Sequence, residues 1–191
     1  MNRDLVNIRF FNGVNGVGKM SVIVNGAVLV DELVYGEYTQ FFKAMPGIYS
    51  FEFVPDEEYS ELSYIENVKF DEGTYTFATC GNFENMEFVV IGQDTEGSLP
   101  NIRFTNLIPF DSVVDIEIND DVVVPGLMYK EVSEVEKINE GDYIFKIFDT
   151  LTENKILEID LQIASNAPHV GLIIGEMGSS QWPVRFILTN D

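Results

Sequence analysis

The sequence predicts an all-β protein made of two tandem Ig-like or transthyretin-like antiparallel β-sandwiches. Three observations lead to this prediction. A pattern of residues recurs at a constant distance, short segments rich in Val, Ile, Phe and Tyr alternate apolar with polar residues, and Gly, Asn and Pro separate those segments. Alternation with a period of two is the signature of a strand with one buried face. Several short strands separated by turn residues are typical of a sandwich.

The recurring pattern is an internal repeat. VNIRFFN at 6–12 returns as PNIRFTN at 100–106, so Asn101 follows Asn7 at an offset of 101 − 7 = 94 residues. The same offset relates further identical residues without a gap: Asn25 and Asn119, Val28 and Val122, Leu33 and Leu127, Tyr35 and Tyr129, Lys43 and Lys137, Gly47 and Gly141, Tyr49 and Tyr143, Phe51 and Phe145, Gly81 and Gly175. We therefore predict a tandem duplication. The first sandwich takes residues 1–93, a short linker takes 94–99 and the second sandwich takes 100–191.

Seven segments of the first copy have the composition of strands. In chain order they are 5–12, 20–26, 27–36, 47–55, 62–70, 73–81 and 86–93. The first segment places Val6, Ile8 and Phe10 on one face, as a half-buried strand does. The runs YTFATCG at 75–81 and HVGLIIG at 169–175 lack this alternation, which predicts strands that are buried on both faces.

One segment leaves two alternatives open. EYTQFFKAM at 37–45 and its counterpart EVSEVEKIN at 131–139 place apolar residues about three positions apart, which is compatible with a short helix. We favour a strand, because Pro46-Gly47 and Glu140-Gly141 follow as turns into the next strand.

The loop FNGVNGVGKM at 11–20 resembles a phosphate-binding loop but does not meet its requirements. Met20 stands where a Ser or Thr must bind magnesium, and MSVIVNG follows where a helix must begin. Asn25-Gly26 is a strong hairpin signal. We therefore predict that the loop connects two strands, and that Lys19 binds no nucleotide.

The composition restricts the classes of partner. The 191 residues are 46% hydrophobic and 13% aromatic, but 32 acidic residues against 11 basic ones give a net charge of −21. Such a surface repels nucleic acid and anionic lipid. Solubility or a crowded habitat explains the acidity, with calcium or a cationic partner as alternatives. No run approaches the roughly 18 apolar residues that span a bilayer, so we predict no membrane insertion. The N-terminus lacks the pattern of a secretory signal, and we expect synthesis in the cytosol.

The candidates for chemistry are few. Cys80, the single cysteine, can form no intrachain disulfide and is expected to be a small core residue. His169 is the single histidine, and because it has no paired nucleophile it is expected to be structural or exposed. It lies in a different copy from Cys80, so a Cys–His pair would need a cleft between the two copies. Ser179 and Ser180 lack the context of an activated nucleophile. The sequence therefore predicts no enzyme: no catalytic residue and no cofactor.

Two acidic clusters and one tryptophan remain. Asp56-Glu57-Glu58 and Asp120-Asp121, the latter beside Asn119, could offer oxygen ligands to calcium, but they lack the alternating spacing and glycine turn of a calcium loop. We interpret them as solvated turns and predict no metal site. Trp182 could stack on a sugar, but such a residue is more often a core or interface side chain.

The strand motifs resemble the domain of unknown function 4397. The clearest parts are VNIRFFN at 6–12, VIVNG at 22–26 and PGIYSFEF at 46–53 in the first copy, with PNIRFTN at 100–106 and VVDIEIN at 113–119 in the second. The resemblance covers nearly the whole chain, once per copy, although the second copy has Lys130 for Gly36 and Glu140 for Pro46. It implies small β-sandwiches, often in tandem, in bacterial surface and secreted proteins. It implies no activity.

Two hypotheses for the function follow. The first is a non-enzymatic structural or adhesive component of a bacterial surface assembly, located at the surface or in the outer layer of the spore, which self-associates through strand edges. The alternative is a module that binds a carbohydrate or a protein through the loops at one end of each sandwich.

Overall fold

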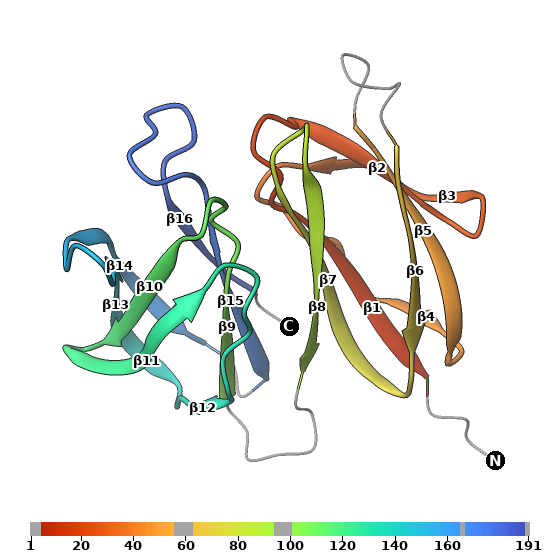
Figure 1. Ribbon diagram of the computed structural model, residues 1–191. Coiled ribbons are helices and arrows are strands. Elements are labelled where there is room, and N and C mark those ends of the chain that lie inside the picture. Colours follow the sequence, from red (N-terminus) through yellow and green to blue (C-terminus); the bar gives the residue numbers. More distant parts are fainter. Residues whose placement is uncertain (1–4, 56–62, 94–100, 165–166, 190–191) are drawn as a thin grey trace. The chain divides into compact units, whose positions relative to one another are not determined.

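The computed structural model describes residues 5–55, 63–93, 101–164 and 167–189 (Figure 1). The chain divides into two compact units, Met1–Gly92 and Gln93–Asp191. Within these residues, each unit has two four-stranded sheets and no helix. The prediction of an all-β chain with two tandem sandwiches is confirmed. The linker that we predicted at 94–99 lies outside the described residues.

The described residues of the first unit form eight strands in two sheets. One sheet has the order β4-β1-β7-β8 and the other has the order β3-β2-β5-β6. The strand bounds are β1 Val6–Asn12, β2 Lys19–Val24, β3 Ala27–Val34, β4 Phe42–Ala44, β5 Gly47–Pro55, β6 Tyr64–Phe70, β7 Gly73–Gly81 and β8 Met86–Gln93. The ambiguous segment is therefore a strand, as favoured above, although β4 is short.

The second unit repeats this arrangement. Its sheets have the orders β12-β9-β15-β16 and β11-β10-β13-β14. The bounds are β9 Asn101–Asn106, β10 Val113–Ile118, β11 Asp121–Met128, β12 Glu136–Lys137, β13 Gly141–Asp149, β14 Lys155–Ile163, β15 Pro168–Ile174 and β16 Arg185–Leu188. The strands β10, β11 and β13 begin and end 94 residues after β2, β3 and β5. The offset found in the sequence is thus also the offset of the strands.

One strand pair in each unit is parallel. β1 pairs with β7 in parallel from Val6 opposite Gly73 to Asn12 opposite Thr79, and β9 pairs with β15 in the same way. Arg9 reinforces the first pair, because its Nε donates to Thr76 Oγ1 at 2.9 Å. β7 and β15 are buried along most of their length, which confirms the prediction from their continuous apolar runs.

The two cores place a phenylalanine and a glycine the opposite way round at two pairs of equivalent positions. In the first unit, Phe77 on β7 lies 5.0 Å from Phe51, ring centre to ring centre, and Gly92 lies on β8. At the offset of 94 the second unit has Gly171 on β15 and Phe186 on β16, and the Phe186 ring stacks 5.3 Å from Phe145. An aromatic ring therefore fills the same part of each core, but from different strands.

The asparagine that ends each IRFxN segment holds the following loop in place through side-chain hydrogen bonds. Asn106 Nδ2 donates to the carbonyl of Leu127 at 3.1 Å and to the carbonyl of Ser112 at 3.1 Å, and its Oδ1 accepts from Ile108 N at 3.0 Å. Asn12 forms the equivalent bonds to Leu33 and Val14. Buried amides of this kind must be paired, so the motif has a structural purpose.

The edges of the sheets differ in regularity. β3 is an edge strand, and its register against β2 shifts twice, between Met20 and Val22 and between Val22 and Ile23. β11 shifts at the equivalent places against β10. Bulges and short edge strands oppose pairing with another chain. β6, by contrast, pairs with β5 in an uninterrupted register from Phe70 to Tyr64.

Candidate functional site

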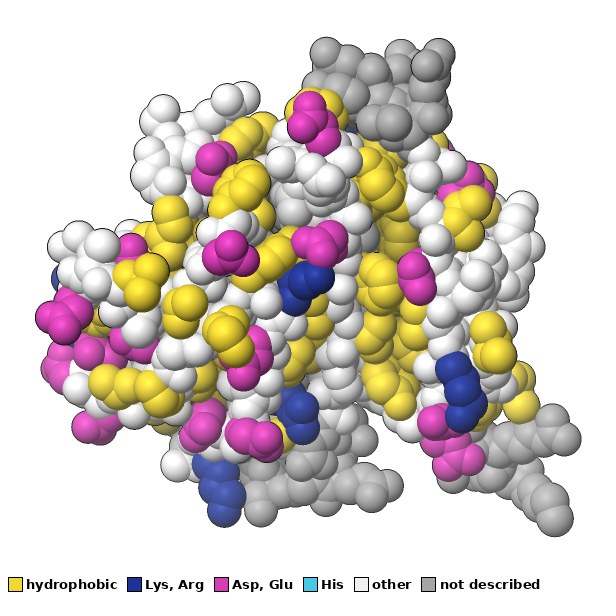
Figure 2. Space-filling model, in the orientation of Figure 1, with side chains coloured by type: hydrophobic (Ala, Val, Ile, Leu, Met, Phe, Trp, Pro, Cys, Tyr) yellow, Lys and Arg dark blue, Asp and Glu magenta, His cyan; other side chains and the backbone are white. Residues whose placement is uncertain are grey.

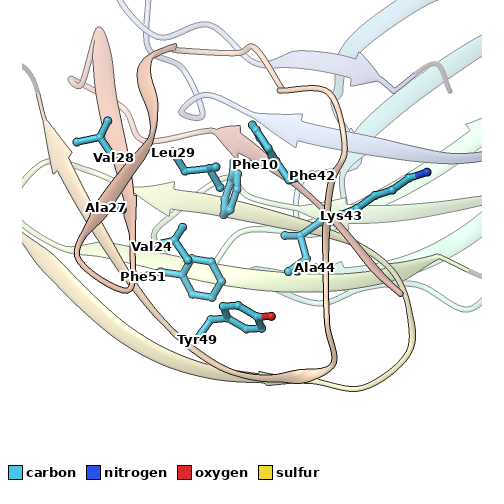
Figure 3. Close-up of a pocket in the computed structure, with 11 residues that line it drawn as sticks. Phe10, Val24, Ala27, Val28, Leu29, Phe42, Lys43, Ala44, Tyr49 and Phe51 are labelled. Carbon is cyan, nitrogen blue, oxygen red and sulfur yellow. The ribbon is translucent and has the colours of Figure 1, made fainter. Parts of the chain in front are cut away.

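A cavity opens at the side of the first sandwich, between the edge strands β3 and β4 (Figure 3). Its volume is about 330 Å³, which lies at the lower end of the range for small-molecule sites. Phe10 and Phe51 reach it from the core, and Phe42 and Ala44 reach it from β4. Its walls are therefore mainly apolar and aromatic.

The β3 bulge shapes one wall of the cavity. Val30 stands opposite Val22 and Val28 stands opposite Ile23, so Leu29 is the extra residue of β3. Leu29 lines the cavity, and it is 40% exposed. Bulges commonly re-aim a side chain in this way. The wall next to the solvent is thus made of apolar groups that the fold leaves partly uncovered.

The polar groups of the lining are few. Lys43 is the charged residue among the described residues that line the cavity, and Figure 3 shows its nitrogen pointing away from the cavity. The Tyr49 hydroxyl donates to the carbonyl of Met45 at 2.6 Å. The cavity can therefore take up an apolar group, but its walls offer no arrangement for acid–base or nucleophilic chemistry.

The second sandwich differs at the equivalent place. Ile138 stands where the first unit has Ala44, it is buried, and it belongs to the core cluster of its unit. Glu136 replaces Phe42, and Asp121 replaces Ala27. The larger side chain of Ile138 occupies core space that Ala44 leaves open. The two copies have therefore diverged at this site.

The second unit has its own distinctive feature, an exposed aromatic turn. Phe110, in the loop between β9 and β10, is 68% exposed, and Phe110 and Asp111 have φ angles of 67° and 55°. A bulky residue with a positive φ is an outlier that the surroundings must hold in place. The first unit has Gly16 at this position, with a φ of 89°.

The glycine-rich loop connects strands, as predicted. Residues 13–18 join β1 to β2, and Lys19 is the first residue of β2. Its Nζ lies 2.7 Å from Glu32 Oε1. Asn25 and Gly26 have φ angles of 49° and 81°, as a hairpin turn of this kind requires. No helix begins after this loop, so no helix N-terminus faces a phosphate position.

The structure assigns local roles to the single cysteine, histidine and tryptophan. Cys80 is a buried residue of β7, as predicted. His169 is buried, and its Nδ1 lies 3.0 Å from the Thr189 carbonyl, so it is structural and not exposed. Trp182 is half-buried in the loop before β16. Its backbone N–H donates to the Ser179 hydroxyl oxygen at 3.1 Å, and its carbonyl accepts from Glu176 N.

The acidic residues of the hairpin between β10 and β11 form a turn. Asp120 is paired with Lys146, which holds the pKa of Asp120 below its usual value and raises the pKa of Lys146. Asn119 Oδ1 accepts from Ile144 N at 2.9 Å. The described residues contain no cluster of three metal-binding side chains. The cluster Asp56-Glu57-Glu58 lies outside the described residues.

The surface of the molecule is acidic on the face that Figure 2 shows, where Asp and Glu side chains are spread among exposed apolar ones and Lys and Arg are fewer. Within the part of the chain that the structure describes, no helix is long and apolar enough to cross a membrane.

The family can now be assigned. A family model described as "Domain of unknown function (DUF4397)" matches residues 6–101, half of the chain. The chain belongs to this family. The resemblance inferred from VNIRFFN and PGIYSFEF is thereby confirmed over the first copy, while the second copy is related to it by the repeat.

Two further comparisons add little about the function. A comparison with curated proteins found no match. One similar solved structure is described as "Alpha-glucan recognition by family 41 carbohydrate-binding modules from streptococcal virulence factors". It is 14% identical, covers 87% of this chain and 92% of its own, and has a TM-score of 0.29. A likeness at this TM-score carries no argument about what this chain binds.

Proposed function

We propose that the protein is a non-enzymatic structural or adhesive module of a bacterial surface assembly, and that its first sandwich holds an apolar group of a partner. The observation that supports this proposal is the aromatic-walled cavity between β3 and β4. A lining of this composition favours binding over chemistry, because the described residues that face it bring no nucleophile and no paired acid and base together.

The free energy gained by burial of one apolar side chain in the cavity is enough for that side chain to anchor a partner. Burial of one Val, Leu or Phe side chain is worth about 1.5–3 kcal/mol. Fully buried apolar or aromatic anchors in pockets of this kind dominate the stability of many interfaces. A cavity that receives one such group is therefore sufficient to fix the register of a larger contact.

The experiment that tests the cavity uses benzene as the probe. In methyl-labelled protein, benzene should shift the NMR resonances of Val24 and Leu29, which line the cavity. The variant Ala44→Ile should lose these shifts, because the larger side chain occupies the cavity. The matched variant Ile138→Ala, in the second unit, should gain shifts at Ile118, its partly buried neighbour in the core cluster.

Two results would contradict the proposal. One is the absence of any shift in the unmodified protein at millimolar benzene. The other is an Ala44→Ile variant that binds benzene as the unmodified protein does, which would place the probe elsewhere.

The alternative function, recognition of a protein or glycan through the loops at one end of a sandwich, is supported by a different observation. Leu151, in the loop after β13, is 81% exposed, and Phe110 is exposed in the loop before β10. Retention on a glycan array that is lost in a Phe110→Asn, Leu151→Ser double variant would favour it. Asparagine is chosen at 110 because it tolerates a positive φ.

The location that we propose is the bacterial surface or the outer layer of the spore. Immunogold electron microscopy of the cells that produce the protein tests this location. Labelling confined to the cell interior, in growing cells and in spores, would contradict it.

A further inference from the structure

We propose that the exposed Phe110 of one molecule inserts into the β3–β4 cavity of a second copy, so that the chain assembles head to tail. This inference rests on the proposed function, because it names the partner of the same cavity. It differs from association through strand edges, which bulges oppose at the edge strands β3 and β11.

The first argument is the way in which the two units have diverged. The first unit has the cavity, because Ala44 is small, but it has Gly16 in place of the aromatic turn residue. The second unit has Phe110, but Ile138 is packed into its core at the position of Ala44. Among the described residues, the cavity therefore lies in one unit and the exposed aromatic turn in the other.

The second argument is the conformation of the turn. Phe110 and Asp111 both have positive φ angles, and the Phe110 ring is 68% exposed. A left-handed conformation at a bulky residue costs free energy. Exposure of a large aromatic ring gains nothing in an isolated molecule. Burial of the ring in an apolar cavity would offset the cost of this conformation.

The third argument is the charge beside each half. Asp111 follows the aromatic residue and is exposed, and Lys43 is an exposed residue at the cavity. The Lys43 nitrogen points away from the cavity (Figure 3), so its long side chain would have to turn toward the opening to bring its positive charge near Asp111 when the ring enters. In a chain with a net charge of −21, this local complementarity offsets part of the general repulsion.

The geometry of such a contact leads to an open assembly. The cavity belongs to the first unit and the aromatic turn to the second, so the two surfaces that meet are different. Heterologous contacts of this kind propagate into filaments unless their rotation closes a ring. Each added molecule offers a new turn and a new cavity.

The test uses two variants that each remove one half. Phe110→Asn removes the ring and tolerates the positive φ, and Ala44→Ile fills the cavity. Light scattering is measured at about 1 M NaCl, where the screening length of about 3 Å suppresses the net repulsion. We expect the mass of the unmodified protein to rise with concentration and each variant alone to remain monomeric, with association weakened at least about thirtyfold.

The decisive measurement is the mixture of the two variants. The Phe110→Asn molecule retains a cavity and the Ala44→Ile molecule retains a ring, so the mixture should form a dimer that contains one of each and should grow no further. A second pair, measured at about 0.15 M NaCl where close charges are screened less, checks the charges. Lys43→Glu should weaken association, up to about fivefold, and Asp111→Asn in its partner, which tolerates the positive φ, should restore part of it.

Three results would overturn the inference. They are an unmodified protein that stays monomeric at millimolar concentration, a single variant that polymerises as the unmodified protein does, and a mixture that gives no mixed dimer. If the cavity still binds benzene in that case, the proposed function stands and only the identity of the partner is wrong. If benzene does not bind either, both fail.

Discussion

Replacement of Gly171 by alanine is expected to destabilise the second unit by about 1–3 kcal/mol, the usual cost of an extra group in a packed core. A Cβ at this position would lie 2.6 Å from Phe186 Cζ and 2.8 Å from Phe104 Cδ1. Because non-bonded carbons are most stable at about 3.5–4.0 Å, the rings must move by nearly 1 Å. Both rings are buried, and Phe186 is stacked on Phe145, so the movement disturbs the whole aromatic core.

The assay is equilibrium unfolding in urea, with a control in each unit. Gly92→Ala is the control in the first unit, because a Cβ there would meet Tyr75 Cε1 at an ordinary 3.7 Å. Phe186→Leu is the second variant, because the smaller side chain should relieve the contact with alanine at 171. The double variant should therefore be more stable than the sum of the two single effects predicts. A Gly171→Ala protein that unfolds at the same urea concentration as the unmodified protein would refute this account of the core.

Three further predictions concern the loops and the surface. Asn106→Ala should destabilise the second unit by about 2–4 kcal/mol, because it leaves several buried hydrogen-bonding groups unpaired. Asn12→Ala should destabilise the first unit less, because Asn12 makes fewer such bonds. Urea unfolding of both variants tests which one is less stable. Lys19→Ala should leave the fold intact, and ATP or GTP binding that disappears in this variant would show that the loop is a phosphate site after all. The pKa of Asp120 is lowered by Lys146, so the stabilisation by this pair exists above the usual Asp pKa and is lost as the pH falls through the lowered value. The unfolding curves of Asp120→Asn and the unmodified protein should therefore converge in acid, and a difference that persists there would contradict the assignment.

The strands could be predicted from the sequence with good accuracy because each one is a local pattern. The segments 47–55, 73–81 and 86–93 have the same bounds as β5, β7 and β8. The hairpin turn at Asn25-Gly26 was also predictable, since few residues other than Asn and Gly adopt its φ angles. The absence of a phosphate site followed from the strand that comes after Lys19.

The pairing of the strands and the cavity could not be predicted in this way. A period of two shows which face of a strand is buried, but not which strand lies beside it, so the parallel pair of β1 and β7 was missed. The cavity was missed because it depends on volume and not on polarity: Ala44 and Ile138 are both apolar. The repeat nevertheless contained a signal for the cavity, because the alignment of the two copies places the small Ala44 opposite the large Ile138. The exchange of Phe77 and Gly171 could have been found by the same comparison.

The parallel pair has a consequence for the order in which the chain can fold during synthesis. β1 cannot complete its sheet until Gly73 has been made, 67 residues after Val6, which at about 5–20 residues per second takes about 3–13 s. During this time β1, an apolar central strand, lacks its parallel neighbour β7. β9 shares the segment NIRF with β1 and could compete for the same neighbour, but during synthesis β7 leaves the ribosome before β9 does. A chain that refolds from denaturant has no such order, and can pair the strands of one copy with those of the other.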